Sequence, residues 1–188
     1  IIFLPLLGAF IIALFLRGGE KEVAHNAKNT ALWITIATLL LSIYLVVVKF
    51  NPAVAHFQLQ ETFEWIEGSG IRYHLGVDGI SIFFVLLTTL LMPICILASW
   101  NSITERVKEY MIAFLALESL ILGVFCSLDF LMFYFFFEAV LIPMFLLIGI
   151  WGGENRVYAA FKFFLYTLLG SVLMLIALLY IYYQTGTM

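Results

Sequence analysis

Residues 130–151 read FLMFYFFFEAVLIPMFLLIGIW, a 22-residue stretch with one charged side chain, Glu138. A helix needs about 20 mostly apolar residues to cross the hydrocarbon core of a bilayer. This stretch therefore predicts a membrane-spanning helix. At a rise of about 1.5 Å per residue, Glu138 would lie roughly 13 Å along it, close to the bilayer centre. The stretch predicts both a membrane fold and a carboxyl group held inside it.

The same apolar pattern recurs along the chain and predicts the fold class. We expect an all-α, polytopic membrane protein with six transmembrane helices in a single membrane domain, 1–188. The expected helices are about 1–16, 30–48, 80–100, 111–128, 130–151 and 157–183. The chain opens directly on apolar sequence with no basic segment before it, so we expect the truncated end of a membrane helix and a fragment of a longer chain.

The composition excludes several classes of protein. Of the 188 residues, 64% are hydrophobic and 11% charged, whereas about a quarter are charged in soluble domains. An ordinary soluble enzyme and a disordered chain are excluded, and a net charge of −3 offers no basic face to nucleic acid. Cys95 and Cys126 lie in apolar runs, and His25, His56 and His74 lie in loops without ligand spacing. No metal or cofactor site is predicted in this chain.

The connections between the expected helices differ in charge. One set, 17–29, 101–110 and 152–156, carries six basic residues, whereas 49–79 and the turn near Asp129 carry two. Basic loops stay on the cytoplasmic or matrix side. We therefore expect 49–79 to be an extramembrane loop on the non-cytoplasmic side. For the membrane itself, a bacterial plasma membrane is favoured over a mitochondrial inner membrane.

Local signals place a few structural residues near the membrane surface. Residues 71–75, IRYHL, alternate apolar and polar side chains, which predicts a short half-buried strand. Asp78 or Ser81 could cap the third helix, and Asp129 the fifth, because their side-chain oxygens can accept hydrogen bonds from first-turn amides.

Three ionisable residues fall inside expected spans, and Glu138 is the most informative. A carboxyl group near the bilayer centre costs a few kcal/mol, so it must be protonated or face a polar partner. A protonated or paired carboxyl group is typical of a site that takes up and releases protons. The structural alternative is that a protonated or paired Glu138 only holds two helices together. Pro143, five residues later, removes a backbone donor and could loosen the preceding turn.

Glu118 and Lys162 are open to both kinds of interpretation. Glu118 lies near mid-span beside a stripe of small residues, which marks close helix packing and turns its carboxyl towards the bundle. Lys162 lies shallow enough to reach the headgroups. It also shares one helix face with Tyr166 and Gly170, which favours an inward polar stripe.

Four segments together resemble a known family. They are Leu75-Gly-Val-Asp78-Gly79-Ile-Ser81, Phe137-Glu138-Ala-Val-Leu-Ile-Pro143-Met144, Trp151-Gly-Gly and Lys162-Phe-Phe-Leu-Tyr166-Thr167. The chain resembles the antiporter-like membrane subunits of respiratory complex I, of the chain M / subunit 4 type. The resemblance implies a 14-helix fold with two inverted five-helix repeats, of which this chain would hold the first six helices.

The resemblance also implies roles for individual residues. Glu138 matches the family's essential fifth-helix glutamate, which pairs with a lysine on the seventh helix, beyond Met188. Lys162 lies on the sixth helix and is not that partner, and Glu118 matches a supporting glutamate on the fourth helix. Asp78 and Gly79 match a loop motif of structural character.

The function implied by the resemblance is proton translocation coupled to electron transfer from NADH to quinone. NADH, FMN, the iron–sulfur clusters and quinone would be bound by partner subunits, so no redox chemistry is expected in this chain. Its partners would be other membrane-arm subunits and the lipid bilayer, not nucleic acid. Two alternatives remain: a subunit of a multisubunit Na⁺/H⁺ antiporter or membrane-bound hydrogenase, and a structural membrane-arm subunit with no proton path.

Overall fold

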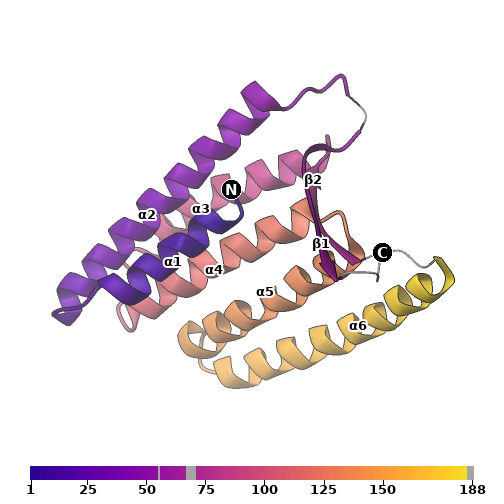
Figure 1. Ribbon diagram of the computed structural model, residues 1–188. Coiled ribbons are helices and arrows are strands. Elements are labelled where there is room, and N and C mark those ends of the chain that lie inside the picture. The colour runs from indigo at the N-terminus through magenta and orange to yellow at the C-terminus, as the bar shows by residue number, and fades with distance from the viewer. Residues whose placement is uncertain (55, 67–70, 186–188) are drawn as a thin grey trace.

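The computed structural model describes residues 1–54, 56–66 and 71–185, which form a helical bundle with one small hairpin (Figure 1). The elements are α1 (Phe3–Phe15), α2 (Glu20–Tyr44), the π-helical segment η1 (Leu45–Lys49), β1 (Gln58–Ile66), β2 (Ile71–Val77), α3 (Ser81–Ser99), α4 (Val107–Cys126), α5 (Phe130–Trp151) and α6 (Arg156–Thr185). Five helical segments, all but α1, are long and apolar enough to cross a bilayer. The chain is an integral, multi-pass membrane protein.

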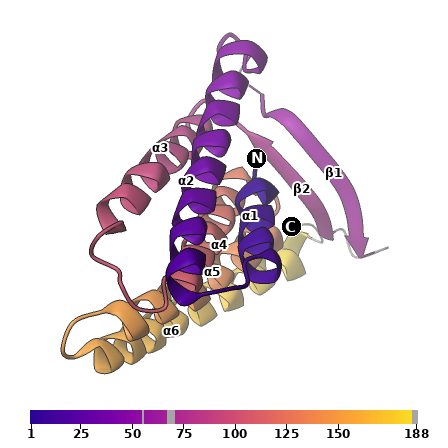
Figure 2. The ribbon, with the colours of Figure 1, turned by 90° about the vertical axis from the view of Figure 1, so that its left-hand side faces the viewer.

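Helix α4 lies at the centre of the bundle. It packs against α1, α2, α3 and α5, while α6 packs against α5 at the edge farthest from α2 (Figures 1 and 2). Successive helices run in opposite directions, so the connections fall at two ends. We call one the basic end, formed by 16–19, 100–106 and 152–155, and the other the hairpin end, formed by the hairpin and 127–129.

Side chains from one segment close the helix ends of another at the basic end. Lys108 Nζ donates to the carbonyls of Ala13 and Leu16, both at 3.0 Å, at the end of α1. Lys28 Nζ donates to the Trp100 carbonyl at the end of α3. These ammonium groups satisfy carbonyls that a helix leaves free at its C-terminus. Part of the positive charge at this end therefore has a structural role.

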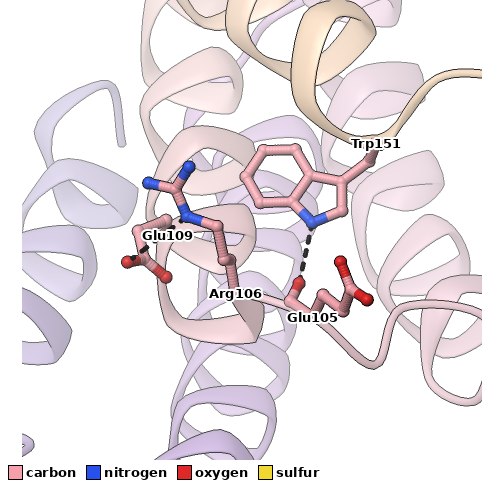
Figure 3. Close-up of polar contacts among 4 residues, drawn as sticks. All are labelled: Glu105, Arg106, Glu109 and Trp151. Carbon is pink, nitrogen blue, oxygen red and sulfur yellow. Dashed lines mark hydrogen bonds and ion pairs between the residues drawn. The ribbon is translucent and has the colours of Figure 1, made fainter.

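The last turn of α5 is tied to the same end. Trp151 Nε1 donates to the Glu105 carbonyl at 2.8 Å, beside an ion pair between Arg106 and Glu109 at 3.8 Å (Figure 3). The Trp151 ring also meets the Tyr110 ring edge-on, with centroids 5.1 Å apart. An indole whose N–H reaches a loop carbonyl while its ring stays in apolar surroundings suits a membrane interface.

Two helices begin earlier than the hydropathy indicates. Helix α2 begins at Glu20 rather than near 30, and α4 begins at Val107 rather than near 111. Apolar length marks the part of a helix that lies in lipid, whereas polar turns can continue the same helix into water. Glu20 and Glu22 lie in the first turn of α2, where negative charge stabilises the helix dipole. Helix α5 spans the expected residues 130–151.

The expected loop 49–79 contains a two-stranded antiparallel sheet, apart from residues 55 and 67–70, which lie outside the described residues. The strand expected at 71–75 is confirmed as part of β2, but its partner β1 was missed. Leu75 and Val77 of β2 are buried in the core at the hairpin end, whereas Phe63 of β1 is 65% exposed. None of the described side chains of β1, at 58–63, is buried, and so this part of the strand carries a weak strand signal.

Asp129 joins the hairpin to the bundle. Its Oδ1 accepts hydrogen bonds from the amides of Leu131 at 2.9 Å and Met132 at 3.3 Å, which confirms the expected cap of α5. Its Oδ2 accepts from the Arg72 amide of β2 at 3.2 Å. Leu128 N donates to the His74 carbonyl at 2.9 Å and reinforces the junction. One buried carboxylate thus fixes both the start of α5 and the position of the hairpin.

The close approach of α4 and α5 at Gly123 gives a test of the bundle. A Cβ at Gly123 would overlap the Phe136 ring, whereas a Cβ at Gly170 of α6 would meet nothing within 4 Å. We expect Gly123→Ala to destabilise the protein by about 1–3 kcal/mol through overpacking. Gly170→Ala, the matched control, should be neutral or slightly stabilising. Thermal unfolding in detergent measures both, and equal stability of the two variants would contradict this packing.

Candidate functional site

Glu138 lies in the middle of α5, beside a groove against α6. The groove is lined by Tyr134, Glu138, Ala139 and Phe164, among others. Glu138 is partly buried, and its Oε1 makes no hydrogen bond to any described group. Tyr134 lies one turn earlier, with its hydroxyl close to the Glu138 carboxyl and to Ser171 of α6. The Oε1 atom is therefore left for a further partner.

Pro143 does not break α5. The helix is continuous from Phe130 to Trp151, and Pro143 is buried within it. The proline removes the amide that would bond the Ala139 carbonyl, one residue after Glu138. A role for Pro143 in helix breaking or gating stays a prediction, since the helix is continuous through it in the described residues.

Glu118 is fully buried at 0% exposure, near the middle of α4. Neither of its carboxyl oxygens makes a hydrogen bond to a described group, and the same holds for the hydroxyl of Ser119. The expectation that Glu118 faces the bundle agrees with this burial. The small-residue stripe beside it includes Gly123, whose close contact with Phe136 packs α4 against α5.

The two buried carboxyl groups lie at similar depth. Glu118 and Glu138 are each ten residues from Leu128, which lies in the turn between the antiparallel helices α4 and α5. With equal helical rise on both sides, they fall within about one helical turn of the same level. The structure thus brings two acidic groups to one layer of the membrane, on adjacent helices.

Lys162 is not brought into this layer. Its side chain is exposed, and its Nζ lies 5.7 Å from the centre of the Tyr158 ring, within cation–π range. Tyr166 is 83% exposed and Gly170 has open space beside it. Within the described residues this face of α6 points away from α5, so the role expected of Lys162 stays a prediction.

The Asp78-Gly79 motif shapes the start of α3. Asp78 Oδ1 accepts from the amides of Ile80 at 3.0 Å and Ser81 at 2.6 Å, and Ser81 Oγ accepts from the Asp78 amide at 2.9 Å. Hydrogen bonds from Ser81 and Ile80 hold the pKa of Asp78 below its usual value of 3.8. A Cβ at Gly79 would meet nothing within 4 Å. The contacts of Asp78 match the structural role expected of the motif.

Within the described ranges, no group of three or more His, Cys, Asp or Glu side chains could hold a metal ion. Sequence reasoning found Glu118 and Glu138 but missed the polar groups around them, namely Tyr134, Ser171 and the unpartnered hydroxyl of Ser119. Tyr134 precedes Glu138 by four residues, so helical spacing alone could have identified it. Ser171 lies on another helix and required the tertiary structure.

Comparison with known families assigns the chain. Residues 23–128 match the family model described as NADH-ubiquinone oxidoreductase chain 4, amino terminus. The chain belongs to this family. Residues 127–188 match a second model, described as NADH:quinone oxidoreductase/Mrp antiporter, TM. The two matches meet in the turn between α4 and α5, and the second includes Glu138.

Relatives and solved structures agree with this assignment. NADH-quinone oxidoreductase subunit M of Rhodobacter capsulatus is 56% identical over 187 residues, covering 100% of this chain and 36% of that protein. NADH-ubiquinone oxidoreductase chain 4 of Chondrus crispus is 52% identical over 184 residues, covering 97% and 36%. A chain of respiratory complex I from Thermus thermophilus with bound NADH matches with a TM-score of 0.82 and 28% identity, covering 98% of this chain and 36% of that one.

A second solved structure shares the fold. A chain of an archaeal membrane-bound sulfane sulfur reductase matches with a TM-score of 0.74 and 20% identity, covering 99% of this chain and 28% of that one. The chain thus spans about a third of the length of the curated relatives it matches.

Asp78 provides a pH-dependent test of the loop motif. Because the pKa of Asp78 is lowered on folding, its stabilising effect is complete above 3.8 and is lost as the pH falls through the lower folded value. We expect Asp78→Ala to cost about 1 kcal/mol at neutral pH, as loss of a helix cap does. The difference in free energy of unfolding between Asp78→Ala and the wild type should decrease below pH 3.8.

Thermal unfolding in detergent at several pH values measures this difference. Glu154→Gln, which alters an exposed glutamate between α5 and α6, is the control and should match wild type throughout. A destabilisation by Asp78→Ala that is as large at acidic pH as at neutral pH would contradict the role given to the charged carboxylate.

Proposed function

We propose that this chain forms the N-terminal part of a proton-translocating membrane subunit of an NADH–quinone oxidoreductase, with Glu138 as a proton carrier. The observation that supports this most is the Glu138 carboxyl group. It lies at mid-membrane depth in a groove, with one buried oxygen free of any described partner. The names of the relatives support the parent complex. NADH, FMN, iron–sulfur clusters and quinone would be bound by other subunits.

The mechanism uses a charge that moves near Glu138. A cation close to the carboxyl group stabilises its ionised form, and withdrawal of that cation favours proton uptake. The cation would be a lysine from a helix that follows Met188, approaching the free Oε1. Moving each proton against 100 mV costs about 2.3 kcal/mol, which electron transfer in partner subunits must supply.

Glu118 and Lys162 are proposed as further groups on the proton path. Glu118 is supported by its complete burial and by its depth, which matches that of Glu138. Lys162 has weaker support, since it lies on the exposed face of α6. That face is free to contact the rest of a longer chain. Its function would then depend on a neighbour and not on Glu138.

A second candidate function is cation/proton exchange, as a subunit of a multisubunit Na⁺/H⁺ antiporter. It is supported by the family model matching 127–188, whose description names the Mrp antiporter beside the oxidoreductase. Glu138 would serve both reactions, so sodium dependence separates them. For the membrane, we propose a bacterial plasma membrane with the basic end in the cytoplasm.

The test is proton pumping in inverted membrane vesicles that carry the full-length protein with Glu138→Gln. Because a positioned proton-transfer group contributes about 100-fold or more, we expect pumping to fall at least about tenfold in an assembled complex. Coupled electron transfer from NADH to quinone should fall with it. Glu154→Gln, an exposed control of the same chemistry, should pump normally.

Three results decide between the candidate functions. Unchanged pumping by an assembled Glu138→Gln complex would make Glu138 a packing residue and favour a structural subunit. Pumping that requires sodium in the wild type would favour the antiporter. NADH-driven pumping without sodium, lost in Glu138→Gln, supports the proposed function.

A further inference from the structure

Buried polar side chains on α2, α3 and α4 lie between two apolar clusters, one at each end of the bundle. On α4, Leu122 and Cys126 belong to the cluster at the hairpin end, and Met111 and Leu115 to the cluster at the basic end. Glu118 lies between them. The same alternation on α3 places Thr89 between Val85 and Ile96. We call these six residues the polar layer: Thr35, Thr38, Ser42, Thr89, Glu118 and Ser119.

The side chains of the polar layer are closed off from the bundle surface. Each of the six is at most 3% exposed. Ser42 and Thr89 meet directly across α2 and α3, with 2.7 Å between their hydroxyl oxygens. Helices α3 and α4 run antiparallel, and the apolar residues that they share in each cluster show which residues lie at the same level. Val85 and Leu122 share one cluster, and Ile96 and Met111 share the other, so Thr89 and Glu118 lie at a similar level along α3 and α4.

Most hydroxyl hydrogens in the layer are already committed to the backbone. Thr35 donates to the Leu32 carbonyl at 3.0 Å, Thr38 to the Ile34 carbonyl at 2.9 Å and Thr89 to the Leu86 carbonyl at 3.1 Å. A hydroxyl that donates to its own helix keeps its oxygen lone pairs available. The layer therefore offers Glu118 acceptors and few donors.

The polar atoms of Glu118 and Ser119 find no hydrogen-bond partner among the side chains around them. Both carboxyl oxygens and the Ser119 hydroxyl lack a partner among the described residues. An ionised carboxyl needs donors, and a protonated one keeps an acceptor oxygen that also needs a donor. An unsatisfied buried polar group costs about 1–3 kcal/mol. A water molecule can donate to the carboxyl group and to a hydroxyl oxygen at once.

We infer that the polar layer binds internal water at Glu118, in a site separate from the groove at Glu138. The water donates to a Glu118 carboxyl oxygen and accepts from the Ser119 hydroxyl or donates to the oxygen of Thr89. This site does not depend on the proposed function. It gives Glu118 a route for proton exchange only if the proposed function is also correct.

Radiolytic labelling in isotopically labelled water tests the site in the assembled complex. Hydroxyl radicals formed from bound water label the side chains beside it. Met92 lies three residues from Thr89 on α3 and is 7% exposed, while Met111 lies in the apolar cluster at 0%. We expect the wild-type protein to incorporate oxygen at Met92 several times faster than at Met111. Similar slow labelling of both residues would overturn the site.

Two variants assign the water to Glu118. Glu118→Gln keeps hydrogen-bonding groups and should retain the fast labelling of Met92, whereas Glu118→Leu should reduce it to the rate of Met111. Fast labelling of Met92 in Glu118→Leu would overturn the assignment. If Glu118→Leu does not assemble, the wild-type comparison of Met92 with Met111 still decides whether the layer is hydrated.

Proton pumping by Glu118→Gln, measured in parallel, keeps the two proposals distinct. Fast labelling with normal pumping supports the water site and removes Glu118 from the proton path. Slow labelling with lost pumping overturns the water site and leaves Glu118 in the proton path.

Discussion

The hydrocarbon core of a bilayer supplies no hydrogen-bond partner, and this constraint shapes every part of the chain. Backbone groups within it must bond to each other, so the spans are helices and the hairpin lies at the bundle end. The same constraint governs side chains. Glu118 lies fully inside the bundle, Glu138 is partly buried beside α6, and the threonine hydroxyls donate to their own helices.

The central position of α4 follows from small side chains and from one buried carboxylate. Gly123 lets α4 approach α5 closely, because the Phe136 ring fills the space where a Cβ would lie. Asp129, in the turn between the same two helices, caps α5 and also holds β2. The depth of Glu138 is set from this end, nine residues after Asp129.

Much of the fold could be predicted from apolar length, since crossing lipid imposes it directly. The bounds of α5 were found in this way. The strand β2 was found instead from the alternation of apolar and polar side chains at 71–75. The early start of α2 was missed because its first turns lie outside the apolar run. Strand β1 was missed because none of its described side chains, at 58–63, is buried. Glu118 and Glu138 stood out because ionisable residues are rare in spans. The role of Lys162 stays a prediction, since helical spacing shows which residues share a face but not what that face contacts.

The central claim of this account is that Glu138 changes its protonation state during turnover. Infrared difference spectroscopy of the full complex, with glutamate carbon isotopically labelled and turnover started by NADH, measures this directly. The account predicts a carboxyl-group signal that appears with NADH, shifts with the label and is missing in Glu138→Gln. The same signal, unchanged in an assembled Glu138→Gln complex, would contradict the account, because the proton would then be carried by another group.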